Sequence, residues 1–301
     1  MDINLRLNKM KSICKKLLPI ILILVFVVTL TACDFDKFWG YVTGDGIGDF
    51  DGKNDTSQVV YNQGNIIQSS NPLADTIERI LPSVVDITCT AVYLPAVGQS
   101  ALVAIKGSGV IVDQDQEYLY IVGSYQSMYF EPTVLDENEK AYTLNGVQAK
   151  VTFMDGKVAD ATFVALIPSA DTGLVKVKKT DALNYPTATM PSSTSTLVGE
   201  EIITISNPLG ILGGTVTTGI VSAERQMQLD EQVSMEVIQT DAEITVNSGG
   251  ILFNKSGEFI GVVYAKAIGE GIEGLNFAIP TSSIIDAYHK KGFLTGLKVG
   301  G

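Results

Sequence analysis

Short runs of alternating apolar and polar residues dominate the chain from about residue 84 onward. The runs are rich in β-branched and aromatic side chains, and Gly, Asn and Asp residues separate them. This alternation predicts strands at 84–92, 110–113, 118–122, 149–154, 161–166, 174–177, 201–206, 214–223, 237–240 and 258–265. Because no helical pattern lies between these strands, the sequence predicts an all-β barrel or sandwich.

Two short helices are expected at the ends of this β-rich region. The first covers residues 75–81 and stops at Pro82. The second is expected to begin with Thr281 or Ser282 as its N-cap and to stop at Gly292. Neither helix interrupts the succession of strands, so the fold class stays all-β.

The first 33 residues have the layout of a bacterial lipoprotein signal. A basic run is followed by the apolar segment 17–30, which is shorter than the roughly 20 residues that span a bilayer. The apolar segment ends in Leu30-Thr31-Ala32-Cys33, which resembles the lipobox. We therefore predict a signal peptide at 1–32, with Cys33 lipidated and the protein anchored to a membrane outside the cytoplasm. An ordinary signal peptide or a short anchor with an incidental cysteine is the alternative.

Residues 33–71 are polar and acidic, and they are expected to form a flexible tether. Without residues 1–32, which hold five of the 21 basic and one of the 33 acidic residues, the chain carries 16 basic and 32 acidic residues, a net charge of −16. Such a charge argues against nucleic acid as a partner. Cys89 then remains as a single thiol in a strand pattern, so we expect a buried core residue and neither a disulfide nor a zinc site.

The most informative segment surrounds Asn247-Ser248-Gly249-Gly250. Four further motifs accompany it in order: GSGVIV at 107–112, SNPLG at 206–210, TGIVSA at 218–223 and GLNFAIP at 274–280. Together they make residues 74–291 resemble the HtrA (Deg-type) branch of the trypsin-like serine proteases. The resemblance implies two six-stranded antiparallel β-barrels at 72–292 with a short C-terminal helix, a tail at 293–301, an active site between the barrels, and no cofactor or metal.

The resemblance places a serine and an aspartate of the catalytic triad but no histidine. Ser248 matches the nucleophile, and Asp171 in DTGLVKV at 171–177 matches the aspartate. In IVGSYQSM at 121–128, Gln126 falls on the position of the general base. A neutral amide cannot accept the hydroxyl proton of the serine. His289 is the one histidine of the chain, and it is expected as a solvated residue at the end of the C-terminal helix.

The oxyanion hole also departs from the family pattern. The segment before Ser248 is one residue shorter, and Val246 stands where the family has a glycine. The backbone N–H groups of the hole would come from Val246, Asn247 and Ser248. A β-branched residue resists the backbone conformations that glycine adopts, so the usual orientation of this peptide is disfavoured.

The sequence therefore predicts a pseudoprotease that acts as a binding or regulatory module. Its expected partner is an extended peptide or an unfolded protein segment in the cleft between the barrels, with the membrane reached through Cys33. The alternative is an active serine endopeptidase that uses Ser248 with an unrecognised base. A PDZ domain, which often follows the barrels in this family, is not expected.

Overall fold

The computed structural model describes residues 71–136, 139–193, 196–228, 234–244, 249–266 and 274–299. These residues all belong to one compact unit of the chain, residues 56–301. The predicted signal peptide, Cys33 and all but the last residue of the predicted tether lie outside the described residues. Among the helices of the described part, none has both the length and the apolar character needed to cross a membrane.

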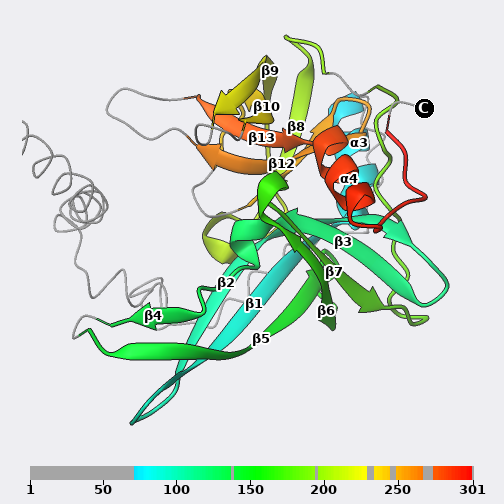
Figure 1. Cartoon of the computed structure of the whole chain (residues 1–301). Coiled ribbons are helices and arrows are strands. Elements are labelled where there is room, and N and C mark those ends of the chain that lie inside the picture. The colour runs from blue at the N-terminus through cyan, green and yellow to red at the C-terminus, as the bar shows by residue number, and fades with distance from the viewer. Residues whose placement is uncertain are drawn as a thin grey trace, which may run out of the picture. The chain divides into compact units, whose positions relative to one another are not determined.

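The first half of the described chain forms a closed barrel (Figure 1). Its strands follow the order β1-β2-β3-β7-β6-β5, and pairing between β5 and β1 closes it. Their bounds are β1 Val84–Pro95, β2 Ala101–Gln114, β3 Tyr118–Ser124, β5 Ala141–Phe153, β6 Val158–Ile167 and β7 Thr172–Lys178. The short strand β4, Thr133–Leu135, adds to the outer edge of β5.

The second half closes a barrel of its own in the order β10-β13-β12-β11-β8-β9. Its strands are β8 Glu201–Ser206, β9 Thr215–Gln228, β10 Ser234–Thr240, β11 Ile251–Asn254, β12 Phe259–Lys266 and β13 Asn276–Pro280. Every pairing in both barrels is antiparallel. The prediction of two six-stranded antiparallel barrels is confirmed.

The alternation along β1 explains how one strand serves two cores. Val85, Ile87 and Cys89 are fully buried inside the first barrel, whereas Val84 packs with residues of the second barrel and the C-terminal helix in a shared apolar cluster. Cys89 is a free, fully buried thiol, as predicted. Burial raises the pKa of this thiol to about 12, so it stays protonated.

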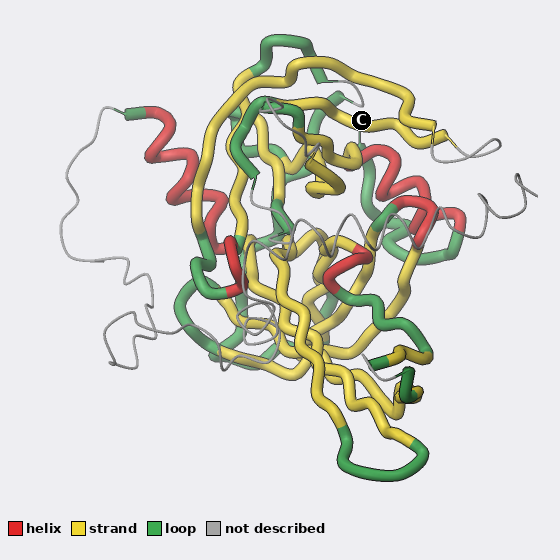
Figure 2. The backbone as a smooth tube through the Cα atoms, turned by 90° about the vertical axis from the view of Figure 1, so that its left-hand side faces the viewer, coloured by secondary structure: helices red, strands yellow, loops and turns green. Residues whose placement is uncertain are grey.

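Two α-helices lie on either side of the strands when the molecule is seen as in Figure 2. Helix α3, Pro72–Ile80, is capped by Asn71, whose Oδ1 accepts a hydrogen bond from Leu73 N at 3.1 Å. Helix α4, Thr281–Lys290, packs its apolar face on the shared cluster. Four short 3₁₀ turns complete the fold: η1 Leu81–Ser83, η2 Tyr125–Ser127, η3 Pro168–Ala170 and η4 Pro208–Gly210.

The predicted N-cap of α4 was wrong. The cap position is Pro280, which has no side chain able to accept a hydrogen bond. Thr281 lies within the helix, and its hydroxyl instead donates to the Phe259 carbonyl at 2.8 Å, tying the helix to β12. The predicted stop is correct, because Gly292 adopts φ +80°, a left-handed conformation that glycine enters without strain.

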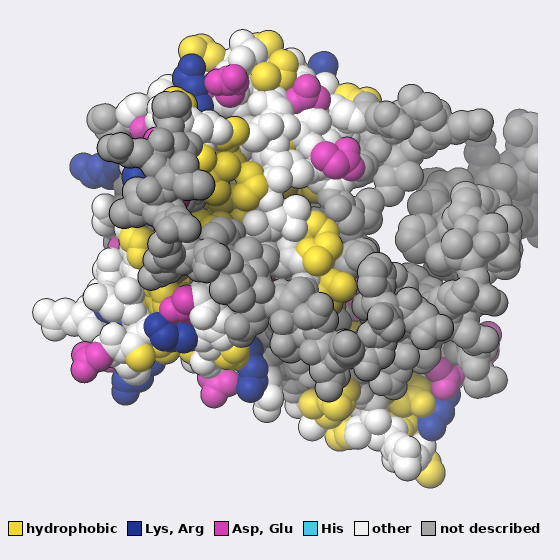
Figure 3. All heavy atoms as spheres, turned by 180° about the vertical axis from the view of Figure 1, so that it is seen from behind, with side chains coloured by type: hydrophobic (Ala, Val, Ile, Leu, Met, Phe, Trp, Pro, Cys, Tyr) yellow, Lys and Arg dark blue, Asp and Glu magenta, His cyan; other side chains and the backbone are white. Residues whose placement is uncertain are grey.

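The surface of the described residues mixes charges of both signs. On the rear face in Figure 3, acidic and basic side chains are interspersed, and hydrophobic side chains lie between them. Scattered apolar side chains of this kind are ordinary for a folded domain.

Candidate active site

Gln126 and Asp171 are brought together by the pairing of β3 with β7. The two strands run antiparallel, and Ser124 at the end of β3 lies opposite Thr172 at the start of β7. Turn η2 continues directly from β3 and carries Gln126, whereas Asp171 directly precedes β7. Residues far apart in the sequence therefore meet at one end of the first barrel.

Asp171 is buried and held by hydrogen bonds from the end of β3. Its side chain is 6% exposed, and its Oδ2 accepts a hydrogen bond from Ser124 Oγ at 3.2 Å. Its carbonyl accepts one from Tyr125 N at 3.0 Å. The backbone at Asp171 is left-handed, with φ 40° and ψ 44°. Asp and Asn tolerate this conformation better than most residues, which fits the residue type found here.

Burial raises the pKa of the Asp171 carboxyl to about 7. Hydrogen bonds from the Ser124 and Gln126 side chains favour the ionised form and lower the pKa, but they do not cancel the cost of desolvation. The carboxyl thus exchanges its proton near neutral pH. In a working triad the aspartate faces an imidazolium that stabilises its charge.

Gln126 occupies the outer side of this pair. It is exposed, its backbone N–H donates to Ser124 Oγ at 3.2 Å, and its side chain hydrogen-bonds to Asp171. The carboxyl therefore orients an amide group. Because an amide has no basic nitrogen near pH 7, the pair cannot take a proton from a nucleophile.

Ser248, Val246 and Asn247 lie outside the described residues. The next residue, Gly249, has φ +58° and lies against β2, since a Cβ there would stand 2.9 Å from Ser108 N. Beside it, a Cβ on Gly107 would stand 2.6 Å from the Cβ of Ser127 in η2. These contacts connect the residue that follows Ser248 to the turn that carries Gln126.

Several residues around this pair were missed by the sequence analysis. The rings of Tyr125 and Tyr129 stack at 4.8 Å between centroids beside Gln126, and Tyr129 donates to Glu131 Oε2 at 3.2 Å. Behind Asp171, the hydroxyls of Thr172 and Tyr288 are 3.2 Å apart, so α4 supports the start of β7. The four-residue spacing of the tyrosines was visible in the sequence, but the Thr172–Tyr288 contact depends on the tertiary fold.

His289 does not replace the missing base. Its Nε2 lies 2.7 Å from the Leu294 carbonyl, and the residue is half-buried. The expectation of a solvated side chain was therefore wrong, because the chain after α4 folds back and covers the ring. Within the described residues, this hydrogen bond joins His289 to the C-terminal tail rather than to Asp171.

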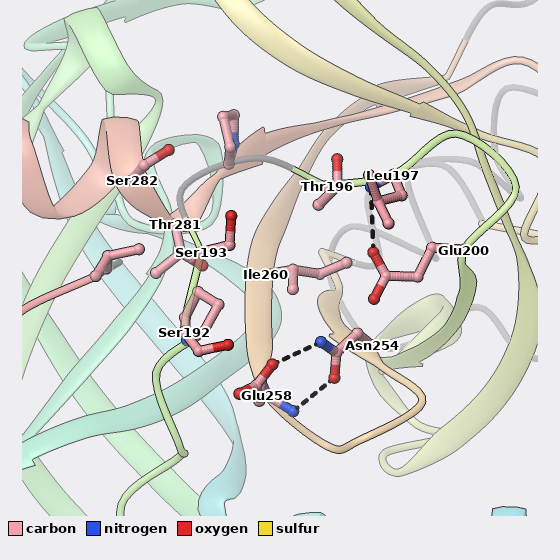
Figure 4. Close-up of a pocket in the computed structure, with 13 residues that line it drawn as sticks. Ser192, Ser193, Thr196, Leu197, Glu200, Asn254, Glu258, Ile260, Thr281 and Ser282 are labelled. Atoms are coloured by element: carbon pink, nitrogen blue, oxygen red, sulfur yellow. Dashed lines mark hydrogen bonds between the residues drawn. The ribbon is translucent and has the colours of Figure 1, made fainter. Parts of the chain in front are cut away.

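A cavity of about 230 Å³ opens elsewhere, on the second barrel. In Figure 4, Glu258 accepts a hydrogen bond from Asn254, and Glu200 accepts one from the backbone of Leu197. The lining residues come from the segment before β8, from β11, the turn after it and β12, from the end of β13 and the start of α4, and from Val299. Since none comes from β3, η2 or β7, this cavity is separate from the Gln126–Asp171 pair. The described residues contain no group of three or more side chains suited to hold a metal ion.

Comparison with known proteins gives the family. A profile of the trypsin-like peptidase domain matches residues 107–262. The periplasmic serine endoprotease DegP of Escherichia coli K12 is 35% identical over 189 residues, which cover 62% of this chain and 36% of DegP. The serine protease Do-like HtrA of Bacillus subtilis is 30% identical over 230 residues, 72% of this chain and 48% of that protein. The chain is an HtrA-type member of the trypsin-like peptidase family.

Solved structures agree with this assignment. The HtrA-type protease AlgW with decapeptide has a TM-score of 0.58 and 25% identity, and the match covers 75% of this chain and 68% of AlgW. AlgW with tripeptide has a TM-score of 0.54 and 28% identity. The HtrA-type chain described here matches only about a third to a half of the length of its curated relatives.

Proposed function

We propose that this HtrA-type protein is a pseudoprotease that binds extended peptides or unfolded protein segments outside the cytoplasm. The observation that carries the proposal is Gln126, which pairs with Asp171 where the family has its general base. Loss of the base in a serine protease lowers kcat by on the order of 10⁶, and only about 10³–10⁴ over the uncatalysed reaction remains. Such a residual rate is far below that of a working protease.

The proposed loss of activity has a second, independent support in the sequence. Val246 replaces the glycine of the oxyanion hole in a segment that is one residue shorter than the family pattern. A single donor of such a hole contributes roughly 10²–10³ in kcat. Two departures in separate segments favour a degenerate site over an alternative catalytic mechanism.

Peptide binding does not require the triad. An extended peptide is held mainly by backbone hydrogen bonds to a strand, and its side chains enter neighbouring pockets. Two solved structures of the HtrA-type relative AlgW carry a peptide, which supports retention of this property here.

The location outside the cytoplasm rests on the predicted signal at 1–32 and on relatives named as periplasmic. We propose that Cys33 carries the lipid that holds the protein at the membrane. Incorporation of labelled palmitate into the parent and into Cys33→Ser tests this proposal. Equal labelling of the two proteins would contradict the proposal that Cys33 carries a lipid.

An active serine endopeptidase is the second candidate, because the curated relatives are named as proteases. A fluorophosphonate probe separates the two functions, because it reacts only with an activated serine. We expect the parent to label no faster than Ser248→Ala, whereas an active HtrA protease labels fully. Labelling that depends on Ser248 would establish a usable base and would overturn the pseudoprotease proposal.

Restoring the histidine tests how far the site has degenerated. Gln126→His returns a base to the end of β3, beside Asp171. We expect no peptide turnover from this variant alone, because the oxyanion segment remains altered. Strong turnover would show that Val246 does not impair the site, and would leave Gln126 as the sole defect.

A further inference from the structure

A half-buried carboxyl, that of Asp86, lies where the first barrel meets the β8–β9 loop of the second. Asp86 on β1 lies opposite Ser108 on β2 in the antiparallel register. Its neighbours Val85 and Ile87 fill the interior of the first barrel. Asp86 therefore points out of that barrel, and it meets Gly213 so closely that a Cβ there would overlap the carboxylate.

The loop that covers Asp86 is attached to the first barrel at two points. Lys106 on β2 donates from Nζ to the Gly210 carbonyl at 3.0 Å, and its alkyl stem lies against Gly210. The Asn207 side chain, 3% exposed, hydrogen-bonds to the Asp86 carboxyl. Asp86 and Asn207 thus join β1 to the residues that directly follow β8.

This contact leaves two buried oxygens without a partner. Both Asp86 Oδ1 and Asn207 Oδ1 are buried, and neither has a hydrogen bond. With Asp86 ionised, both atoms are acceptors, so neither can satisfy the other. A buried polar atom without a partner destabilises the folded state unless something supplies the missing hydrogen.

We propose that Asp86 and Asn207 form a proton-operated latch between the two barrels. In the closed latch, a proton taken up from solvent resides on Asp86 Oδ1 and is donated to Asn207 Oδ1, while Asn207 Nδ2 donates to Asp86 Oδ2. One proton thereby satisfies both unpartnered oxygens in a cyclic acid–amide pair. Removal of this proton leaves the carboxylate facing an amide oxygen and loosens the loop.

The surroundings of Asp86 support proton uptake in an accessible pH range. Burial raises the pKa of this carboxyl to about 6, although the Asn207 hydrogen bond and the charge of Lys106 lower it. Lys106 is the charged group that acts on Asp86. The covering loop, residues 207–214, contains no titratable side chain, and the neighbour of Asp86 on β5 is Thr152. Asp86 is therefore the group whose titration operates the latch.

The latch lies near Gly249, through the residue that pairs with Asp86. Ser108, the cross-strand neighbour of Asp86, has a buried hydroxyl without a partner, and its backbone N lies against Gly249. The latch is independent of proteolytic activity, because it depends only on packing between the barrels.

Hydrogen exchange of the whole protein tests the latch through the amides of residues 210–212 and 215, which close this loop with local hydrogen bonds. In the parent, we expect protection, corrected for the intrinsic exchange rate, to fall by about tenfold or more between pH 5 and pH 8. Asp86→Asn is the decisive variant, because its amide reproduces the protonated pair at every pH. Its loop should stay protected at pH 8.

Lys106→Met is the matched control, since it removes the other attachment of the same loop. Its protection should be lower at both pH values, but the dependence on pH should remain. Protection in the parent that does not change with pH would overturn the proposal. So would a pH dependence in Asp86→Asn equal to that of the parent, or loss of the dependence in Lys106→Met.

Discussion

Replacement of Asp171 by Asn should stabilise the protein at alkaline pH. The carboxyl is 6% exposed and has no cationic partner among the groups that shift its pKa. Asn keeps the size of the side chain, still accepts a hydrogen bond from Ser124, and tolerates the left-handed backbone at φ 40°. The substitution therefore removes a buried charge and little else.

The magnitude follows from the pKa. Burial raises it from 3.8 to about 7, and each pKa unit corresponds to about 1.4 kcal/mol, so ionisation of the folded protein at pH 8.5 costs up to roughly 4 kcal/mol. The sign follows from proton linkage. Between the two pKa values the folded state binds more protons than the unfolded state, so this contribution to stability is present below pH 4 and is lost as the pH rises through about 7.

Urea unfolding of the parent and of Asp171→Asn at pH 5 and pH 8.5 measures the effect. We expect the variant to be more stable by roughly 1.5 kcal/mol at pH 5, where part of this contribution is already lost, and by up to about 4 kcal/mol at pH 8.5. Asp86 titrates in both proteins, so its contribution cancels in the difference. Asp181→Asn, at an exposed turn, is the control and should leave the profile unchanged. A difference between parent and variant that does not vary with pH would refute the assignment of a buried, destabilising charge.

Two further outcomes are expected. Tyr288→Phe removes the hydroxyl that lies 3.2 Å from Thr172 Oγ1. Because both groups are buried, urea unfolding should show a free energy of unfolding lower by about 1–2 kcal/mol. No loss of stability would mean that this contact does not hold α4 on the first barrel. The thiol of Cys89 should not react with a disulfide reagent at pH 8 in the folded protein, because it is buried and its pKa is raised to about 12. It should react fully in urea. Fast reaction without denaturant would show that the first barrel opens.

The way each strand is buried explains which strands the sequence predicted and which it missed. A strand whose burial alternates, such as β1, was predicted from its correct first residue. Strand β11 was missed because all four of its residues are buried, which leaves no alternation to detect. Strand β4 has three residues and depends on its pairing with β5. Isolated from that neighbour, its sequence carries no strand signal.

The candidate site was only partly accessible to sequence reasoning. Motifs pointed to Asp171 and Gln126, because Asp171 directly precedes a strand with a recognisable pattern and Gln126 follows another. Ser124 was not identified from the sequence, since its hydrogen bond to Asp171 depends on the register between β3 and β7. The Asp86–Asn207 contact was equally hidden, because it joins two barrels whose packing no local pattern encodes.

The packing of helix α4 bears on how this protein unfolds. It packs on β12 and β13 of the second barrel and on η3 of the first, and Tyr288 lies in an apolar cluster to which both barrels contribute. The barrels are therefore a single cooperative unit, although each closes its own ring of strands. A cut between the barrels would expose the apolar cluster to which both contribute, so neither half is expected to fold as an independent fragment.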